Sequence, residues 1–172
     1  MAARSGSVLL AFPTALGWVG ILHQRHRIER VRFGYSCRND LQDAFGGSAV
    51  RVGKRDMIEG QWVDIFEKYS RGQKVSFSSL DLDFSWTTDF QRRVLLACRE
   101  IPFGETLSYG QLAAKAGFPQ AARAVGSVMR GNRYPLAVPC HRVVGHKGLG
   151  GFTSPCGIDM KRRLIEMENM CR

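Results

Sequence analysis

The sequence has no acidic residue between Glu105 and Asp159, although the chain as a whole contains 15 of them. Basic residues continue through this stretch, at Lys115, Arg123, Arg130, Arg133, Arg142 and Lys147. The formal net charge of +10 favours a polyanionic partner, either nucleic acid or an acidic membrane surface. Net charge alone also fits a basic protein without such a partner. The stretch between Glu105 and Asp159, which has basic but no acidic residues, is more informative, and it predicts a binding face.

Closely paired cysteines are also missing. The five cysteines are an odd number and lie far apart, at Cys37, Cys98, Cys140, Cys156 and Cys171. This argues against a disulfide framework and for a reducing compartment inside the cell, cytoplasmic or nuclear. His23 and His26 with Cys37 match no close zinc-ligand spacing, so we predict no metal.

The chain has no long unbroken hydrophobic run. Residues 5–22 are uncharged, but Pro13, Gly17 and Gly20 interrupt them. A signal peptide requires a continuous apolar region, and a membrane span requires more residues. We therefore expect strands of a globular domain here, and no membrane association.

The first half of the chain predicts a small α/β domain. The full length of 172 residues, 44% of them hydrophobic, suits one compact domain or two small ones. Apolar patterning and turn residues predict strands at 8–12, 16–22, 28–35 and 75–84, a short helix from an Asn39 cap to Phe45, and a helix at 57–69.

The second half predicts helices that begin at capping boxes. Thr88 with Gln91 opens a helix to about Ile101, and Ser108 with Gln111 opens another through Ala116. A third helix begins at 119 or 120 and ends at Arg130, and Asp159 caps a last one at 160–170. Two short helices around a glycine-containing turn are typical of a helix-turn-helix. We place the domain boundary between residues 86 and 87, giving domains 1–86 and 87–172.

The helix ending at Arg130 is predicted to have two different sides. Its inner side is apolar, with Ala121, Val125 and Val128, and its outer side carries Arg123, Ser127 and Arg130. Ala122 and Gly126 are small, so the backbone could approach a nucleic-acid groove while the arginines contact phosphates or reach between bases. An ordinary solvated face would mix both charges and carry longer side chains.

A thiol, an imidazole and a guanidinium are adjacent in residues 139–144, Pro-Cys-His-Arg-Val-Val. Pro135 and Pro139 bracket an apolar run, which predicts a short extended segment in the core. The thiolate is the reactive form of cysteine, and a nearby imidazole lowers the thiol pKa. Neighbours on a strand point to opposite faces, however, so a water or a third residue would have to relay the proton. We expect Glu168 to face His141. The alternative is that Cys140 and His141 are simply buried core residues.

Several segments resemble the methylated-DNA–protein-cysteine methyltransferase family, also called alkylguanine-DNA alkyltransferases. Residues 139–144 resemble its active-site signature. Further similar segments are residues 101–106 with Ser108 and Tyr109 (helix-turn-helix entry), 121–126 (recognition helix), 129–132 (hinge) and, more loosely, 14–19 (N-terminal strand).

The resemblance implies an α/β fold, in which a ribonuclease H-like N-terminal domain precedes a mostly helical domain with a helix-turn-helix. It also implies direct, irreversible transfer of an alkyl group from O6 of guanine in double-stranded DNA to the cysteine, by a monomer without a cofactor. The protein would react once. Whether O4 of thymine is also a substrate stays open.

The resemblance assigns roles to individual residues. Cys140 would accept the alkyl group, with His141 as a water-relayed base held by Glu168. Arg123 would replace the flipped guanine in the stack from the minor groove, Tyr109 would rotate its phosphate, and Asn132 would tie the hinge to the cysteine. The other DNA-binding residues would be Ala122, Gly126, Ser127 and Arg130, and the substrate pocket would include Val138, Phe152 and Thr153.

One segment departs from the family, and two other functions stay open. The family usually has a Gly-Gly pair after the pocket loop, where residues 153–157 read Thr-Ser-Pro-Cys-Gly. A cysteine hydrolase or transferase acting on acyl groups would need an oxyanion hole, and no distinctive motif supplies one. A non-catalytic protein that binds damaged DNA is the other alternative.

Overall fold

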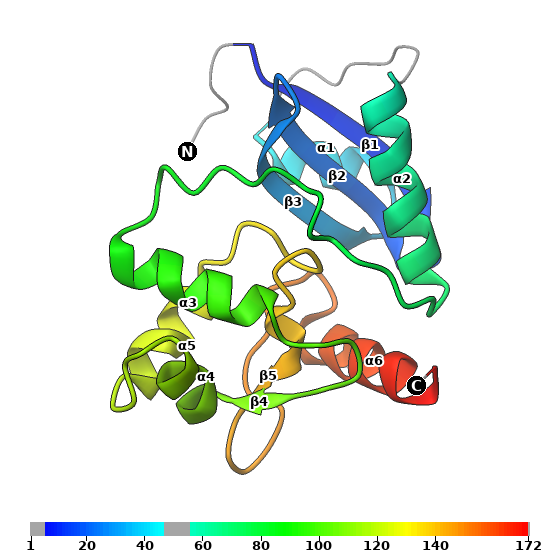
Figure 1. Cartoon of the computed structure of the whole chain (residues 1–172). Helices are drawn as coiled ribbons and strands as arrows, with labels where there is room; N and C mark the ends of the chain where they lie inside the picture. Colours follow the sequence, from blue (N-terminus) through cyan, green and yellow to red (C-terminus); the bar gives the residue numbers. More distant parts are fainter. Residues whose placement is uncertain (1–5, 47–55, 172) are drawn as a thin grey trace. The chain divides into compact units, whose positions relative to one another are not determined.

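The computed structural model describes residues 6–46 and 56–171. The chain forms two compact units, of which the first ends at Asp83 and the second begins at Phe84 (Figure 1). The secondary structure is mixed, with a small antiparallel sheet in the first unit and mainly helices in the second. No helix of the described residues is apolar and long enough to span a membrane.

The first unit is built on a three-stranded antiparallel sheet in the order β1-β2-β3. Its strands are β1 (Val8–Thr14), β2 (Gly17–Gln24) and β3 (Arg27–Tyr35). The strands predicted at 8–12, 16–22 and 28–35 are therefore confirmed. Gly17 has φ +95°, and a Cβ there would lie 2.8 Å from the carbonyl oxygen of Tyr35, so this turn requires glycine.

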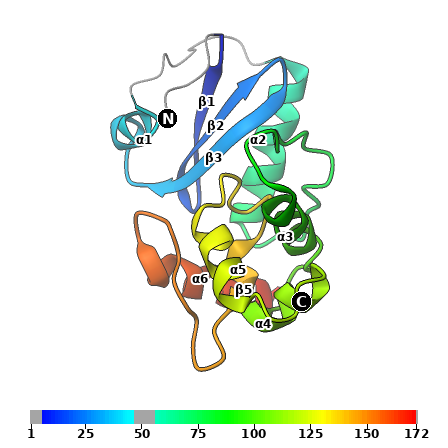
Figure 2. The same cartoon turned by 90° about the vertical axis from the view of Figure 1, so that its left-hand side faces the viewer.

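Two helices cover opposite faces of this sheet (Figure 2). Helix α1 (Arg38–Ala44) packs on the face of Leu9 and Leu22, and α2 (Met57–Ser70) packs Phe66 against Phe12. Leu9 and Phe12 point to opposite faces because side chains alternate along a strand. Both faces are therefore buried, and the sheet forms the core of the unit.

Two predictions for this unit were wrong in detail. Residues 75–84 are irregular, with a turn at 78–79, and only Leu82 pairs with the sheet, through a single parallel bridge to Ile28. The apolar pattern arises from burial instead, since Phe77, Leu80 and Leu82 are all buried. Helix α1 begins after Cys37, whose sulfur accepts from the Asp40 N–H, rather than after Asn39.

The second unit contains four helices and a short parallel strand pair. Its elements are α3 (Asp89–Arg99), β4 (Leu107–Ser108), α4 (Tyr109–Lys115), α5 (Ala122–Arg130), a 3-10 turn η1 (Cys140–Arg142), β5 (Val143–Val144) and α6 (Gly157–Met170). Both predicted capping boxes are present, at the starts of α3 and α4. Pairing of β4 with β5 brings the start of α4 beside the chain that follows Cys140.

Two helix starts in this unit differ from the prediction. Helix α5 begins at Ala122, because residues 118–121 first form a turn closed by the Ala121 N–H and the Phe118 carbonyl, at 2.9 Å. Helix α6 begins at Gly157, two residues before the predicted cap. Asp159 lies within its first turn and pairs with Arg162 at 2.6 Å instead of capping it.

Two histidines contact the carboxylates at the start of α2. Asp56 caps α2, and Glu59 completes the capping box. His23 Nε2 lies 3.1 Å from Glu59 Oε1, with both side chains buried, and His26 Nε2 lies 2.8 Å from Asp56 Oδ2, nearer the surface. Burial lowers the pKa of His23, although Glu59 opposes that effect.

This lowered pKa predicts how stability depends on pH. Unfolded His23 binds a proton near pH 6.5, and the folded residue resists it, so the free energy of unfolding should fall as the pH drops below about 6.5. His23→Gln should flatten this slope in urea unfolding between pH 7 and 5. His26→Gln, at a largely exposed pair, serves as the control. An unchanged slope in His23→Gln would contradict the prediction.

Candidate active site

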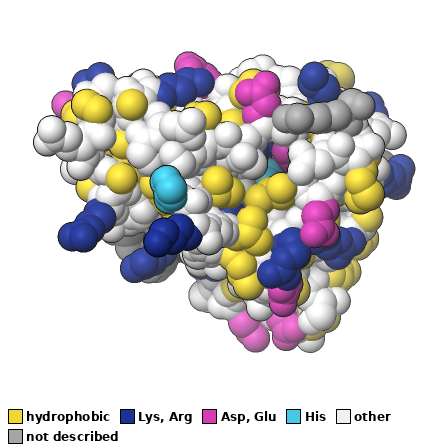
Figure 3. Space-filling view, turned by 90° about the horizontal axis from the view of Figure 1, so that it is seen from below, with side chains coloured by type: hydrophobic (Ala, Val, Ile, Leu, Met, Phe, Trp, Pro, Cys, Tyr) yellow, Lys and Arg dark blue, Asp and Glu magenta, His cyan; other side chains and the backbone are white. Residues whose placement is uncertain are grey.

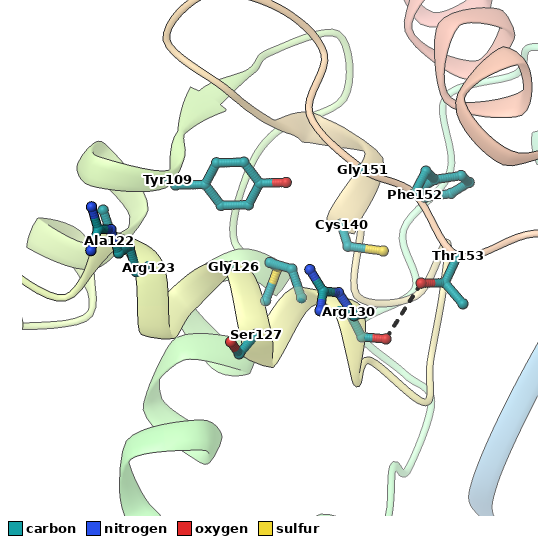
Figure 4. A pocket seen from close by; sticks show the side chains of 11 residues that line it. Tyr109, Ala122, Arg123, Gly126, Ser127, Arg130, Cys140, Gly151, Phe152 and Thr153 are labelled. Carbon is teal, nitrogen blue, oxygen red and sulfur yellow. Dashed lines mark hydrogen bonds between the residues drawn. The ribbon is translucent and has the colours of Figure 1, made fainter.

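A pocket of about 620 Å³ opens in the second unit beside α5 (Figure 4). It is formed by the start of α4, one side of α5, the η1 turn and the loop before α6. Its lining residues are Tyr109, Ala122, Arg123, Gly126, Ser127, Met129, Arg130, Cys140, Gly151, Phe152 and Thr153. Most of the residues predicted for the site therefore come together here, from segments far apart in the sequence.

Helix α5 forms one wall of the pocket. Its inner side is buried through Val125, Val128 and Met129, while Arg123 and Arg130 are exposed. This agrees with the two sides predicted for the helix. At its centre Gly126 faces Tyr109, and an added Cβ would be 3.9 Å from the ring. The helix thus presents small side chains with an arginine towards each end.

In the view from below, Lys and Arg side chains lie at several separate places on this face, some of them beside Asp or Glu side chains (Figure 3). On α5, Arg123 and Arg130 lie towards opposite ends of a helix wall that also carries Ala122, Gly126 and Ser127. Such an arrangement suits contact with successive groups of a polyanion.

Cys140 begins a tight turn rather than lying on an extended segment, so the predicted strand was wrong. The Cys140 N–H donates to Val138 O at 2.8 Å, and the Arg142 N–H donates to Pro139 O at 2.9 Å. The chain turns immediately after Pro139, which places the partly buried Cys140 at the pocket and the fully buried His141 behind it.

Asn132 connects the end of α5 to the chain that leads to Cys140. Its Nδ2 donates to Val138 O at 2.8 Å, and its Oδ1 accepts from the Tyr134 N–H at 2.9 Å. Tyr134 is fully buried, and its hydroxyl accepts from Trp86 Nε1 at 2.9 Å. Val138 is also buried and is not part of the pocket lining in the described structure, where its carbonyl serves this turn.

Behind the cysteine, His141 and Arg142 share one carboxylate. His141 Nε2 lies 2.8 Å from Glu168 Oε1. Arg142 donates from Nε to Oε2 at 3.0 Å and from Nη2 to Oε1 at 2.9 Å, and the Gly104 N–H donates to Oε2 at 2.9 Å. Burial alone would raise the pKa of Glu168, but these hydrogen bonds outweigh it and hold the pKa far below its usual range.

The thiol and the imidazole are set for proton transfer between neutral groups. Burial raises the pKa of Cys140, while a hydrogen bond from Asn132 and the charge of Lys161 oppose that rise. Burial lowers the pKa of His141, against the pull of Glu168. His141 is therefore neutral near pH 7, with its Nε2 bonded to Glu168.

Tyr109 and the pocket loop form the opposite wall. Tyr109 begins α4, and its ring packs so closely on Gly150 that an added Cβ would lie 2.9 Å from the phenol oxygen. Burial and the thiolate form of Cys140 raise the pKa of Tyr109, so its hydroxyl stays protonated. Thr153 Oγ1 lies 3.5 Å from the Arg130 carbonyl, and the Phe152 ring turns away from Cys140 (Figure 4).

The sequence analysis missed Lys161, although it is fully buried on α6. Its amine donates to Val143 O at 2.5 Å and to Gly151 O at 3.3 Å. The helical period could have identified it. Lys161, Leu164 and Glu168 are spaced as one inward stripe, of which Leu164 and Glu168 were predicted to face inward and Lys161 was not. The predicted helix face thus carried a second buried charge.

Comparison with known proteins agrees with this geometry. Residues 89–170 match the family model of the 6-O-methylguanine DNA methyltransferase DNA-binding domain. A methylated-DNA–protein-cysteine methyltransferase of Methanosarcina acetivorans is 40% identical over 129 residues, covering 69% of this chain and 80% of the relative. One from Mycobacterium bovis is 46% identical over 107 residues, 62% of each protein, so that alignment spans less than two thirds of the relative.

Solved structures of the family share the fold over nearly the whole chain. The crystal structure of Mycobacterium tuberculosis OGT in complex with DNA has a TM-score of 0.74 at 30% identity, covering 95% of this chain and 94% of that one. The O6-methylguanine-DNA methyltransferase of Pyrococcus kodakaraensis has a TM-score of 0.68 at 26% identity, with coverage of 94% and 98%. With 40% identity across 80% of a curated relative and the matching fold, the chain belongs to the methylated-DNA–protein-cysteine methyltransferase family.

Proposed function

We propose that this protein repairs DNA by moving a methyl or larger alkyl group from O6 of guanine to Sγ of Cys140. The observation that carries the proposal is a thiol facing an open pocket with a buried His-Glu pair directly behind it. Known relatives at 40–46% identity are methylated-DNA–protein-cysteine methyltransferases, which supports the same chemistry here.

The reaction needs one proton to leave Cys140 and one to reach guanine. A water would carry the thiol proton to His141, and the Glu168 carboxylate would stabilise the imidazolium that forms. The thiolate attacks the alkyl carbon, so an S–C bond forms and the C–O6 bond breaks. The departing guanine takes up a proton, for which we propose the hydroxyl of Tyr109 in the pocket lining as the donor. The thioether is stable, so each protein molecule reacts once.

The alkylated base would have to leave the duplex to reach the thiol. Flipping a base costs a few kcal/mol, and less where pairing is already damaged. We infer that α4 and α5 act as a helix-turn-helix, with α5 in the minor groove. Ala122, Gly126 and Ser127 would allow close approach, and Arg123 would fill the space that the guanine leaves.

The two domains would divide these tasks. Residues 87–172 would bind double-stranded DNA and accept the alkyl group, with Phe152 and Thr153 beside the base and Asn132 holding the cysteine turn. Residues 1–86 would form a supporting ribonuclease H-like domain. The protein would act as a monomer inside the cell without a cofactor. O4-alkylthymine is a second substrate to test.

Alkyl transfer to Cys140 should be visible as a change in protein mass. After exposure to an oligonucleotide with one O6-methylguanine, the intact protein should gain the mass of one methyl group, located on the peptide that contains Cys140. Cys140→Ala should abolish the gain while retaining affinity for the oligonucleotide. Cys156→Ala is the matched control and should react normally. Methylation of Cys98 or Cys156, continuous turnover, or binding without any mass change would refute the proposal.

Loss of the Glu168 charge should weaken the base. In Glu168→Gln, the pKa of His141 should fall further and the thiolate of Cys140 should form only at higher pH. Transfer should slow by about 10-fold or more, a part of the roughly 10²–10⁴-fold that acid–base catalysis contributes. The exposed Glu166→Gln on the same helix is the control. A rate-versus-pH profile that does not move in folded Glu168→Gln would exclude the relay.

Arg123 and Arg130 should differ in their effect on repair. If Arg123 enters the stack, Arg123→Ala should slow transfer from a G·C-paired duplex much more than transfer from a single strand. Arg130→Ala should weaken both substrates similarly and reduce the salt dependence of binding by about one ion. Single-turnover rates on both oligonucleotides at several salt concentrations test this. Equal slowing of both substrates by Arg123→Ala would mean that Arg123 contacts only phosphate.

A further inference from the structure

Lys161 is a fully buried cation that lacks a carboxylate partner among the residues that the structure describes. Its amine donates to two neutral carbonyl oxygens, those of Val143 and Gly151. These bonds satisfy donors but do not cancel a charge. An ammonium group is costly to bury without an opposite charge, so its position calls for an explanation.

The charges around Cys140 are unequal before the thiol ionises. Arg142 and Lys161 are both buried cations, and Glu168 is the carboxylate that lies among them. Arg142 donates two hydrogen bonds to Glu168, so the charges of these two side chains compensate each other, and His141 beside them is neutral. One positive charge therefore remains, and it belongs to Lys161.

We propose that Lys161 is the counter-ion of the Cys140 thiolate and also positions the pocket loop against β5. This inference rests on the proposed role of Cys140 as the alkyl acceptor. Transfer of the Cys140 proton to His141 leaves the total charge of the site unchanged, but it places a negative charge on Sγ, which Lys161 offsets. The imidazolium of His141 is stabilised by Glu168, and Lys161 keeps its own protons throughout.

The electrostatics around both groups support this pairing. Burial lowers the pKa of Lys161, and the thiolate forms of Cys140 and then Cys98 are the charges that oppose the decrease. Conversely, Lys161 is among the groups that oppose the raised pKa of Cys140. Each charged form therefore stabilises the other. The interaction acts across a buried site, where charges are weakly screened.

Other titratable or charged groups near the pair come from every surrounding element. They are Cys98 on α3, Tyr109 on α4, Arg130 on α5, His141 and Arg142 on η1, and Glu168 on α6. Cys98 is fully buried, and burial raises its pKa well above the usual value, so it stays neutral and does not compete for Lys161. Arg142 and Glu168 compensate each other. Cys140 is thus the group that can supply the missing negative charge.

The positioning role follows from what the amine connects. Val143 belongs to β5, directly after the cysteine turn, and Gly151 belongs to the pocket loop. The same amine lies 6.0 Å from the centre of the Tyr109 ring, which is on the same wall as the pocket loop. One side chain from α6 therefore joins β5 to the pocket loop and carries the charge that the thiolate needs.

The test measures the reactivity of Cys140 without DNA. Iodoacetamide would be applied across a range of pH, and modification of the Cys140 peptide would be followed by mass spectrometry. In Lys161→Met and Lys161→Gln, the midpoint pH of the Cys140 modification rate should rise by about one pH unit. The rate of Cys140 modification at pH 7 should therefore fall about 10-fold. Arg162→Met removes a positive charge from the exposed neighbour on α6 and should leave the midpoint unchanged.

The outcomes separate the two roles. A lower rate at every pH with an unchanged midpoint would leave Lys161 only its positioning role and overturn the counter-ion assignment. The iodoacetamide assay needs no alkylated DNA, so a shifted midpoint would support the counter-ion role even if no methyl transfer to Cys140 were found. Absence of methyl transfer would refute the proposed function, and not the counter-ion role.

A second measurement on the unaltered protein covers the case in which the variants do not fold. Carboxamidomethylation of Cys140 converts the thiol into a neutral thioether, so Lys161 loses its counter-ion. Its amine should then give up a proton at lower pH than before, which NMR of isotopically labelled lysine side chains can follow. Titration of Lys161 at the same pH before and after modification would overturn the proposal.

Discussion

The second unit depends on one buried carboxylate. Glu168 accepts hydrogen bonds from His141, Arg142 and the Gly104 N–H, and so joins α6 to the cysteine turn and to the turn after α3. A buried carboxylate is tolerated only with such complete compensation. If the carboxylate were removed, Arg142 would remain as a buried unpaired charge, so the same interaction serves both stability and the proposed reaction.

Helix α6 packs behind the site with one side that carries both charged and apolar residues. Lys161 and Glu168 lie two turns apart, with the fully buried Leu164 between them. The apolar residue anchors the helix, while Glu168 binds His141 and Arg142, and Lys161 binds the Val143 and Gly151 carbonyls. In the proposed reaction the base and the counter-ion would thus be positioned by one regular helix, and α5 and the pocket loop would form the surface that DNA meets.

The success of the sequence predictions depended on how local their signals were. The capping boxes at Thr88 and Ser108 specified helix starts, because each box is complete within four residues. The segments at 75–84 and at Cys140 were predicted as strands, but the first is irregular and the second is a turn. An apolar pattern shows only that side chains are buried. A strand also requires a neighbouring strand that pairs with its backbone groups, and the sequence pattern does not show whether one is present.

Short motifs and helical periodicity were sufficient to identify the family and the apolar side of α5, and they predict Cys140 as the alkyl acceptor. The folded chain was needed to show that Arg142 shares Glu168 with His141, and that Lys161 is buried with no carboxylate partner among the described residues. Charges can be read from a sequence, but their pairing cannot. Pairing depends on which segments the fold brings together, and burial then determines whether an unpaired charge matters.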